Sequence, residues 1–229
     1  MELRIGIDAS INATGFVMML KEGNTIIETS YYLLTPKMKK YPEISESVEH
    51  LIYNRFWPSK KSTYSQTDIY KILSAENLVD VLVNKIKLKL LEIGSVEKIS
   101  CRIEGSLMSA SFNNGMARLN DLVAFGSVMR YCLIKSGLIT EFKIIPPKTL
   151  KKLATGNGNA KKGQMITCHA EKFPESGLIY KGKIDDVVDA FWLAYVEEPK
   201  NFIDKEEFDF NNKNKYHAEH IFALYSERD

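Results

Sequence analysis

The sequence lacks any apolar run close to the length of a membrane span, and its N-terminus lacks a basic segment followed by an apolar one. Its longest apolar stretches, such as 144–147, fall far short of the ~20 residues that a bilayer requires. We therefore expect no membrane span, no signal peptide and a cytoplasmic location. Cysteine is also scarce. Cys101, Cys132 and Cys168 form no Cys-x-x-Cys pair, so neither a disulfide framework nor a cysteine-based zinc site is indicated.

Neither sign of charge is in excess. Lys and Arg number 31 against 29 Asp and Glu, for a net charge of +2. This balance excludes a polycation that coats nucleic acid through its net charge, so a nucleic-acid site would have to arise from local clusters. With 229 residues, of which 45% are hydrophobic, the chain suits one soluble domain with appendages.

The order of predicted elements indicates an α/β fold. Three strands open the chain, the second and third joined by a Gly-Asn turn, as expected of an antiparallel meander. Later strands alternate with helices, which favours parallel pairing and a mixed sheet flanked by helices. The predicted strands are 3–7, 14–20, 25–34, 98–104 and 140–145, and the predicted helices are 68–92, 116–136, 148–154, 160–172 and 185–196.

Two segments fall outside this alternation. Residues 35–66 read as an irregular insertion with one short helix near 45–53, and residues 197–229 as a polar tail with a weak helix at 216–225. The main domain would then span 1–196. Aromatic side chains of the insertion, beside Arg55 and several lysines, could stack on unpaired bases or could cover an edge of the sheet.

Carboxylates stand where predicted strands end. Asp8 ends the first strand and Glu104 the fourth, while Asp186 and Asp189 share one face of a late helix. If the two strands are parallel neighbours, these acids converge at one edge of the sheet and repel one another unless a cation neutralises them. An oxygen-only donor set suits Mg²⁺ or Mn²⁺. Taken singly, each acid is equally well explained as a turn, strand-end or helix-cap residue.

Lysines concentrate between residues 148 and 172. Six lysines there face a single acid, Glu171, and such local charge is suited to neutralising phosphates. Gly156 and Gly158 would let the backbone approach a phosphate closely. A solvated lysine-rich face is the alternative. The segment is not a P-loop, since no Gly-Lys-Ser/Thr follows, and we interpret Cys168-His169 as helix packing rather than a nucleophile.

Several of these blocks, in this order, resemble the RuvC-type Holliday-junction resolvases of the ribonuclease-H-like superfamily. The resemblance covers roughly residues 3–34 and 96–196. With its long insertion, the chain is more similar to a phage or viral resolvase than to a compact bacterial one. The blocks are Gly6-Ile7-Asp8, Thr14-Gly15, Ile103-Glu104, Pro146-Pro147-Lys148, Thr155-Gly156-Asn157-Gly158-Asn159-Ala160-Lys161-Lys162 and Asp186-Val187-Val188-Asp189-Ala190.

The resemblance implies four ligands for two Mg²⁺ ions, namely Asp8, Glu104, Asp186 and Asp189, with Asp185 as a competing choice. Lys151 and Lys162 match the two functional lysines of the family. Leu107 stands where the family has an aromatic wedge, and an apolar side chain there can still part a base step. The wider set of expected DNA contacts comprises Lys148, Lys151, Lys152, Lys161, Lys162 and Leu107.

The implied activity is an endonuclease that resolves four-way junctions by paired symmetric nicks, leaving a 5′ phosphate and a 3′ hydroxyl. Two identical nicks imply a homodimer, for which the apolar stripe of the 116–133 helix is a candidate surface and ordinary core packing its alternative. A flap or fork nuclease, a non-catalytic junction-binding module, and a fragment of an actin-like or sugar-kinase-like ATPase are the competing classes.

Overall fold

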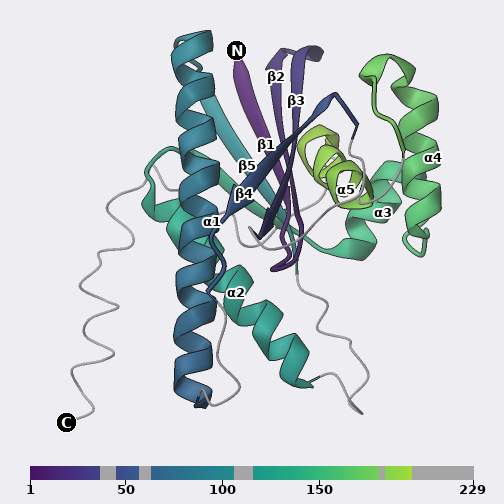
Figure 1. Cartoon of the computed structure of the whole chain (residues 1–229). Coiled ribbons are helices and arrows are strands. Elements are labelled where there is room, and N and C mark those ends of the chain that lie inside the picture. The colour runs from purple at the N-terminus through teal and green to yellow at the C-terminus, as the bar shows by residue number, and fades with distance from the viewer. Residues whose placement is uncertain (37–44, 57–62, 106–115, 181–183, 198–229) are drawn as a thin grey trace.

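A six-stranded mixed sheet with helices against both faces forms the fold (Figure 1). The computed structural model describes residues 1–36, 45–56, 63–105, 116–180 and 184–197. Along the chain the elements are β1 (Glu2–Asp8), β2 (Thr14–Glu22), β3 (Thr25–Pro36), β4 (Val48–Tyr53), α1 (Tyr64–Ile93), β5 (Lys98–Glu104), α2 (Met116–Lys135), β6 (Glu141–Ile145), α3 (Pro147–Thr155), α4 (Lys162–Lys172), a 3₁₀ turn (Pro174–Ser176) and α5 (Ile184–Tyr195).

The strand order is β4-β3-β2-β1-β5-β6. β1, β2 and β3 form the antiparallel meander, whereas β5 pairs in parallel with both β1 and β6. Because β2 alone runs against its neighbours, the carboxyl ends of the other five strands lie at one edge of the sheet. This arrangement confirms the predicted fold class, and it makes β1 and β5 the parallel neighbours on which the convergence of Asp8 and Glu104 depends.

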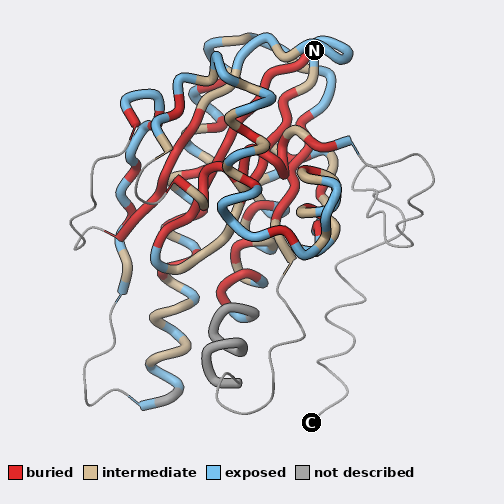
Figure 2. The backbone as a smooth tube through the Cα atoms, turned by 90° about the vertical axis from the view of Figure 1, so that its right-hand side faces the viewer, coloured by how far each residue is buried: buried red, intermediate tan, exposed pale blue. Residues whose placement is uncertain are grey.

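Each face of the sheet has its own helical layer. Side chains alternate along a strand, so Leu3, Ile5 and Ile7 of β1 join the core beneath α1 and α2. The even-numbered positions of β1 face α5, which α3 and α4 cover in turn (Figure 1). α5 is apolar almost all round, as expected of a helix enclosed between two layers. Figure 2 shows the buried backbone gathered where sheet and helices meet.

The predicted short helix near 45–53 is wrong, because residues 48–53 form strand β4. It pairs in parallel with β3 from Tyr31↔Val48 to Pro36↔Tyr53. An unpaired outer edge of β3 would leave backbone groups without partners, and pairing overrides the local helical preference. Tyr53 is buried and its hydroxyl donates to the Ile11 carbonyl at 2.5 Å. At this position the insertion covers the sheet edge.

Helix boundaries differ from the predictions by a few residues. α1 begins at Tyr64 rather than near 68, because Thr63 caps it: Thr63 Oγ1 accepts from the Gln66 amide at 3.3 Å, and Gln66 Oε1 accepts from the Thr63 amide at 2.9 Å. Within the described ranges, no helix combines the length and apolarity needed to cross a membrane.

Where the side chains of α2 are described, from residue 124 on, its apolar stripe belongs to the core of its own chain. Met129 and Leu133 are fully buried there, so these positions are unavailable as a dimer surface and that prediction is wrong for them. The same helical spacing of apolar residues arises whether the stripe packs against α1 or against a second chain, so the sequence does not distinguish the two. The helix predicted at 216–225 lies outside the described residues.

Candidate active site

Asp8 and Glu104 extend from neighbouring strand ends on the face of the sheet that α5 covers. β1 and β5 run parallel and pair up to Ile7↔Ile103, which leaves the two acids side by side. Both stand at even positions, the ones that face α5, and the two carboxyl groups lie close enough for each to shift the pKa of the other. Two neighbouring carboxylates repel each other, so ionisation of one disfavours ionisation of the other unless a cation lies between them.

Two glycines let α5 approach these acids closely. A Cβ atom at Gly6 would lie 1.9 Å from the Ala190 carbonyl oxygen, and one at Gly15 would lie 1.9 Å from that of Asp186. Gly15 is also the direct strand partner of Asp8. The backbone at Asp186 therefore rests on the β2 position beside Asp8, which brings the first turn of α5 to the acidic strand ends.

Asp186 and Asp189 are the two acids of α5 that face this edge. Asp186 is buried, with 7% of its surface exposed. The charges of Glu104, Asp186 and Asp189 all act on Asp8, so the structure brings together the four acids that the resemblance implied. Asp185, one residue earlier, is directed elsewhere, toward α4.

Burial and mutual repulsion perturb these acids strongly. Burial first, and then the neighbouring Glu104, Asp186 and Asp189 charges, raise the pKa of Asp8 well above its usual range. For the same two reasons, burial and then Glu104, the pKa of Asp189 is raised to about 7. Burial raises the pKa of Glu104 as well, against the opposing pull of Lys151 and Lys162. The cluster is therefore a site where a nearby positive charge relieves the repulsion between carboxylates near neutral pH.

Lys162 supplies part of that charge. It is the first residue of α4, and its ammonium donates to Asp185 Oδ2 and lies 3.6 Å from Asp186 Oδ1. Partial burial opposes the charged form, but the bond to Asp185 and the charges of Asp185, Asp186 and Asp189 raise the pKa of Lys162. The ammonium is therefore fixed at the margin of the acidic cluster in its charged state.

The other predicted DNA-contacting lysines extend from the same edge. α3 follows β6 directly, and the Gly105 amide donates to the Ile145 carbonyl at 2.9 Å, which ties α3 to the end of β5. Lys151 lies close enough to act electrostatically on Glu104. The remaining three, Lys148, Lys152 and Lys161, are exposed. Their ammonium groups are therefore open to solvent.

Two features of the basic segment have structural roles. Lys172 donates to the Ala154 carbonyl at 3.2 Å and lies 5.1 Å from the centre of the Trp192 ring, so it joins α4 to α3 and α5. Gly156 closes α3 with φ of 79°, a left-handed conformation that glycine adopts without strain. These contacts account for both residues without a ligand.

The chemistry of the donor set fits a divalent cation. Four carboxylates meet, and among the described residues Lys151 and Lys162 are the cations that act on them. Hard oxygen donors are those that Mg²⁺ and Mn²⁺ prefer. As the side chains stand, no group of three or more His, Cys, Asp or Glu among the described residues is arranged to hold an ion. The ion pairs of Lys162 with Asp185 and Asp186 supply part of the neutralisation instead.

His169 is a packing residue, as expected from the sequence. Its ring is fully buried and meets the Phe191 ring edge-on at 4.3 Å, and its Nδ1 hydrogen-bonds the Tyr180 hydroxyl at 2.8 Å. Burial lowers the pKa of His169 to about 4. Its role is to hold α4, which carries Lys162, against α5, which carries the acids.

Sequence reasoning missed a basic cluster at the opposite end of α5. Arg102 donates to the Val196 carbonyl, while Arg4 and Lys21 bond the Glu197 carboxylate at 2.5 and 2.9 Å. All three cations are buried, and they cap the carboxyl end of α5. The available signal was a basic residue at an inward position of an otherwise apolar strand, as in Arg4 and Arg102.

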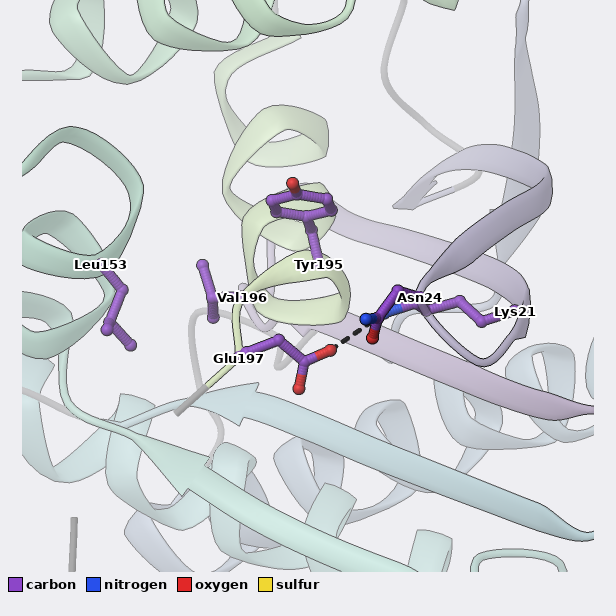
Figure 3. A pocket seen from close by; sticks show the side chains of 6 residues that line it. All are labelled: Lys21, Asn24, Leu153, Tyr195, Val196 and Glu197. Carbon is purple, nitrogen blue, oxygen red and sulfur yellow. Dashed lines mark hydrogen bonds and ion pairs between the residues drawn. The ribbon is translucent and has the colours of Figure 1, made fainter. Parts of the chain in front are cut away.

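A pocket of about 400 Å³ opens beside this cluster (Figure 3). It is separated from the acids by the length of α5, so it is not part of the acidic site. Its lining residues are Lys21, Asn24, Leu153, Tyr195, Val196 and Glu197. Leu107, the predicted wedge, lies outside the described residues.

Comparison with known proteins finds similarity in structure only. No protein-family model and no curated protein sequence matches the chain. Among solved structures, RuvC of Thermus thermophilus aligns with a TM-score of 0.45 and 12% identity, covering 84% of this chain and 91% of that one. T. thermophilus RuvC in complex with Holliday junction substrate gives 0.44 and 12%, over 84% and 90%. The yeast mitochondrial Holliday junction resolvase Ydc2 gives 0.39 and 12%, over 83% and 75%.

Proposed function

We propose that this protein is a metal-dependent endonuclease that cuts branched DNA, with the four-way Holliday junction as its main substrate. The observation that carries the proposal is the convergence of Asp8, Glu104, Asp186 and Asp189 on one face of a sheet edge, bordered by lysines. The choice of a four-way junction comes from the resemblance of the sequence blocks that contain these residues.

Asp8, Glu104, Asp186 and Asp189 would hold two Mg²⁺ or Mn²⁺ ions. When bound, such ions activate water as a nucleophile and neutralise charge on the leaving oxygen of a phosphodiester. The raised pKa values of Asp8 and Asp189 support this use, because they mark a place where added positive charge relieves repulsion. Nicks made in this way leave a 5′ phosphate and a 3′ hydroxyl.

The lysines would bind and orient the DNA. Lys162 holds its ammonium at the margin of the acids, where it can donate to a non-bridging oxygen of the phosphate that is cut. Lys151 would position the adjacent backbone. Lys148, Lys152 and Lys161 are exposed along the same edge and would neutralise flanking phosphates, which makes binding sensitive to salt. Leu107 stays a candidate for parting a base step.

Paired nicking requires two active sites related by symmetry. A four-way junction has approximate two-fold symmetry, so a homodimer would present one acidic edge to each of two opposed strands. The buried α2 positions Met129 and Leu133 do not supply its interface, which must therefore use other surfaces.

The test is a cleavage assay on end-labelled four-way, three-way and flap DNAs, with Mg²⁺ and with chelator. We expect paired nicks at symmetric positions of the four-way junction, and none in chelator. Asp8→Asn should lower the cleavage rate by roughly 100-fold or more, because the asparagine amide cannot replace a carboxylate ligand, and should leave junction binding within about threefold.

Two of the competing classes have their own outcome in this assay. Cutting confined to flaps would indicate a flap or fork nuclease, and junction binding without cutting at any Mg²⁺ concentration would indicate a non-catalytic binding module. Near wild-type cutting by Asp8→Asn would contradict the assignment of the acids.

A further inference from the structure

Asp185 and Asp186 are adjacent in the first turn of α5 but have different surroundings. Successive helical residues point about 100° apart, so the two side chains leave the helix in different directions. Asp186 is buried at the β2 contact, and its carbonyl oxygen lies where a Gly15 side chain would be. Asp185 is directed to α4, where its Oδ2 accepts a hydrogen bond from Lys162.

Lys162 needs an external constraint to point at the acids. Its side chain is 60% exposed, so apolar packing does little to fix its direction, and a free lysine side chain carries about 2 kcal/mol of rotamer entropy. Asp185, whose side chain is 19% exposed, is the only group that the described contacts place in hydrogen-bond distance of Lys162 Nζ. That bond leaves the ammonium 3.6 Å from Asp186 Oδ1.

The two helices are held so that this bond can form. The Trp192 indole of α5 donates to the Met165 carbonyl of α4 at 3.2 Å, and His169 packs between Phe173 and Phe191. The starts of α4 and α5 therefore keep a fixed separation, which keeps Asp185 within hydrogen-bond distance of Lys162.

We propose that Asp185 is a positioning residue that holds the Lys162 ammonium beside the metal-binding acids, and that it is not itself a metal ligand. This inference rests on the proposed function and deepens it, because it assigns how the phosphate-facing lysine is oriented. Without Asp185 the lysine keeps its charge but loses its direction, so the chemical step slows while metal binding and DNA binding persist.

Calorimetric titration with Mn²⁺, without DNA, separates a ligand from a positioning residue. Asp185→Asn should bind Mn²⁺ within about twofold of wild type, whereas Asp186→Asn should lose at least about tenfold in affinity. Thermal unfolding in chelator serves as the folding control, and Asp185→Glu as the conservative variant. Loss of Mn²⁺ binding by a folded Asp185→Asn chain, equal to that of Asp186→Asn, would overturn the inference.

Single-turnover cleavage with saturating enzyme tests whether Asp185 acts through Lys162. Asp185→Asn should lower the rate about tenfold, Asp185→Glu should restore at least part of it, and junction affinity measured in Ca²⁺ should change by less than about threefold. In a Lys162→Ala background, Asp185→Asn should cause no further loss, because the two residues act as one unit.

The outcomes separate this inference from the proposed function. A wild-type chain that neither binds Mn²⁺ nor cuts branched DNA overturns the proposed function and the inference with it. A wild-type chain that cuts, beside an Asp185→Asn chain that cuts equally fast, overturns the inference alone. The inference is also overturned if Asp185→Asn lowers the cleavage rate by the same factor in the Lys162→Ala background as in the wild type.

Discussion

At the scale of single residues, the acidic cluster and His169 are held in ionisation states that the folded chain imposes. The acids gain protons more readily than in the unfolded chain, and His169 gains one less readily. The two groups thus act on stability in opposite directions as the pH falls. Raised carboxyl pKa values favour the folded state on acidification, whereas a lowered histidine pKa disfavours it.

The histidine contribution can be isolated by substitution. The unfolded imidazole takes up a proton near its ordinary pKa of 6.5, whereas the folded one does so only near 4. Between these values the unfolded state binds more protons, so His169 should cost stability as the pH falls through this window, by at most about 3 kcal/mol.

The measurement is chemical denaturation of the wild type and His169→Phe at pH 7 and at pH 4.5. Subtracting the two profiles cancels the acids, which are common to both chains. We expect the wild type to lose about 2 kcal/mol more than the variant on acidification. Equal losses would mean that the folded imidazole is protonated as readily as the unfolded one.

At the scale of elements, the site depends on how α5 lies on the sheet. Its amino end carries Asp185, Asp186 and Asp189 over the ends of β1 and β5, and Gly6 and Gly15 set the distance between helix and strands. Buried cations cap its carboxyl end. The helix is therefore fixed at both ends, and a shift of either contact moves the acids relative to Asp8.

Gly15→Ala should affect stability and cutting together. A methyl group 1.9 Å from the Asp186 carbonyl oxygen cannot fit unless α5 moves away from β2. We expect a loss of about 1–3 kcal/mol in the free energy of unfolding. We also expect cleavage to fall by roughly 100-fold, because a displacement of about 1 Å at the acids is costly to catalysis.

Gly126→Ala is the matched control for that substitution. Its new methyl group would meet only the flexible end of the Arg130 side chain, at 3.3 Å, and alanine favours a helix over glycine by up to about 1 kcal/mol. It should leave cutting unchanged and stability equal or higher. Wild-type cutting by Gly15→Ala would show that α5 does not need this contact to place its acids.

At the scale of the whole molecule, much of the fold could be predicted because its main signals are local. Apolar runs that end in a carboxylate gave β1 and β5 with Asp8 and Glu104 at their ends, and the Gly-Asn turn gave the β2–β3 hairpin. The alternation of strands and helices predicted parallel pairing for the later strands. That β1 and β5 are neighbours was only a condition of the sequence argument, and the structure meets it.

What could not be predicted depends on contacts between distant segments. β4 forms because β3 offers an unpaired edge. The six residues of β4 show no regular alternation of apolar and polar side chains that would predict a strand. The close approach at Gly15 and the direction of Asp185 toward Lys162 arise only once α4 and α5 are packed. For the same reason the sequence left Asp185 and Asp186 as alternatives.

The central claim is that four acids remote in sequence form one site for divalent cations, and thermal unfolding with and without Mn²⁺ tests it most directly. An ion that binds only the folded chain raises its unfolding temperature. We expect Mn²⁺ to stabilise the wild type and the control variant Glu171→Gln equally, because Glu171 is an exposed acid of α4 outside the cluster.

The Mn²⁺-dependent rise should be lost in Asp8→Asn and in Asp186→Asn. In chelator, Asp8→Asn should unfold at a higher temperature than the wild type, because removing one carboxyl relieves the repulsion that raises the pKa of Asp8. An Mn²⁺-dependent rise of the same size in the wild type, Asp8→Asn, Asp186→Asn and Glu171→Gln would show that the cation binds elsewhere and would contradict the claim.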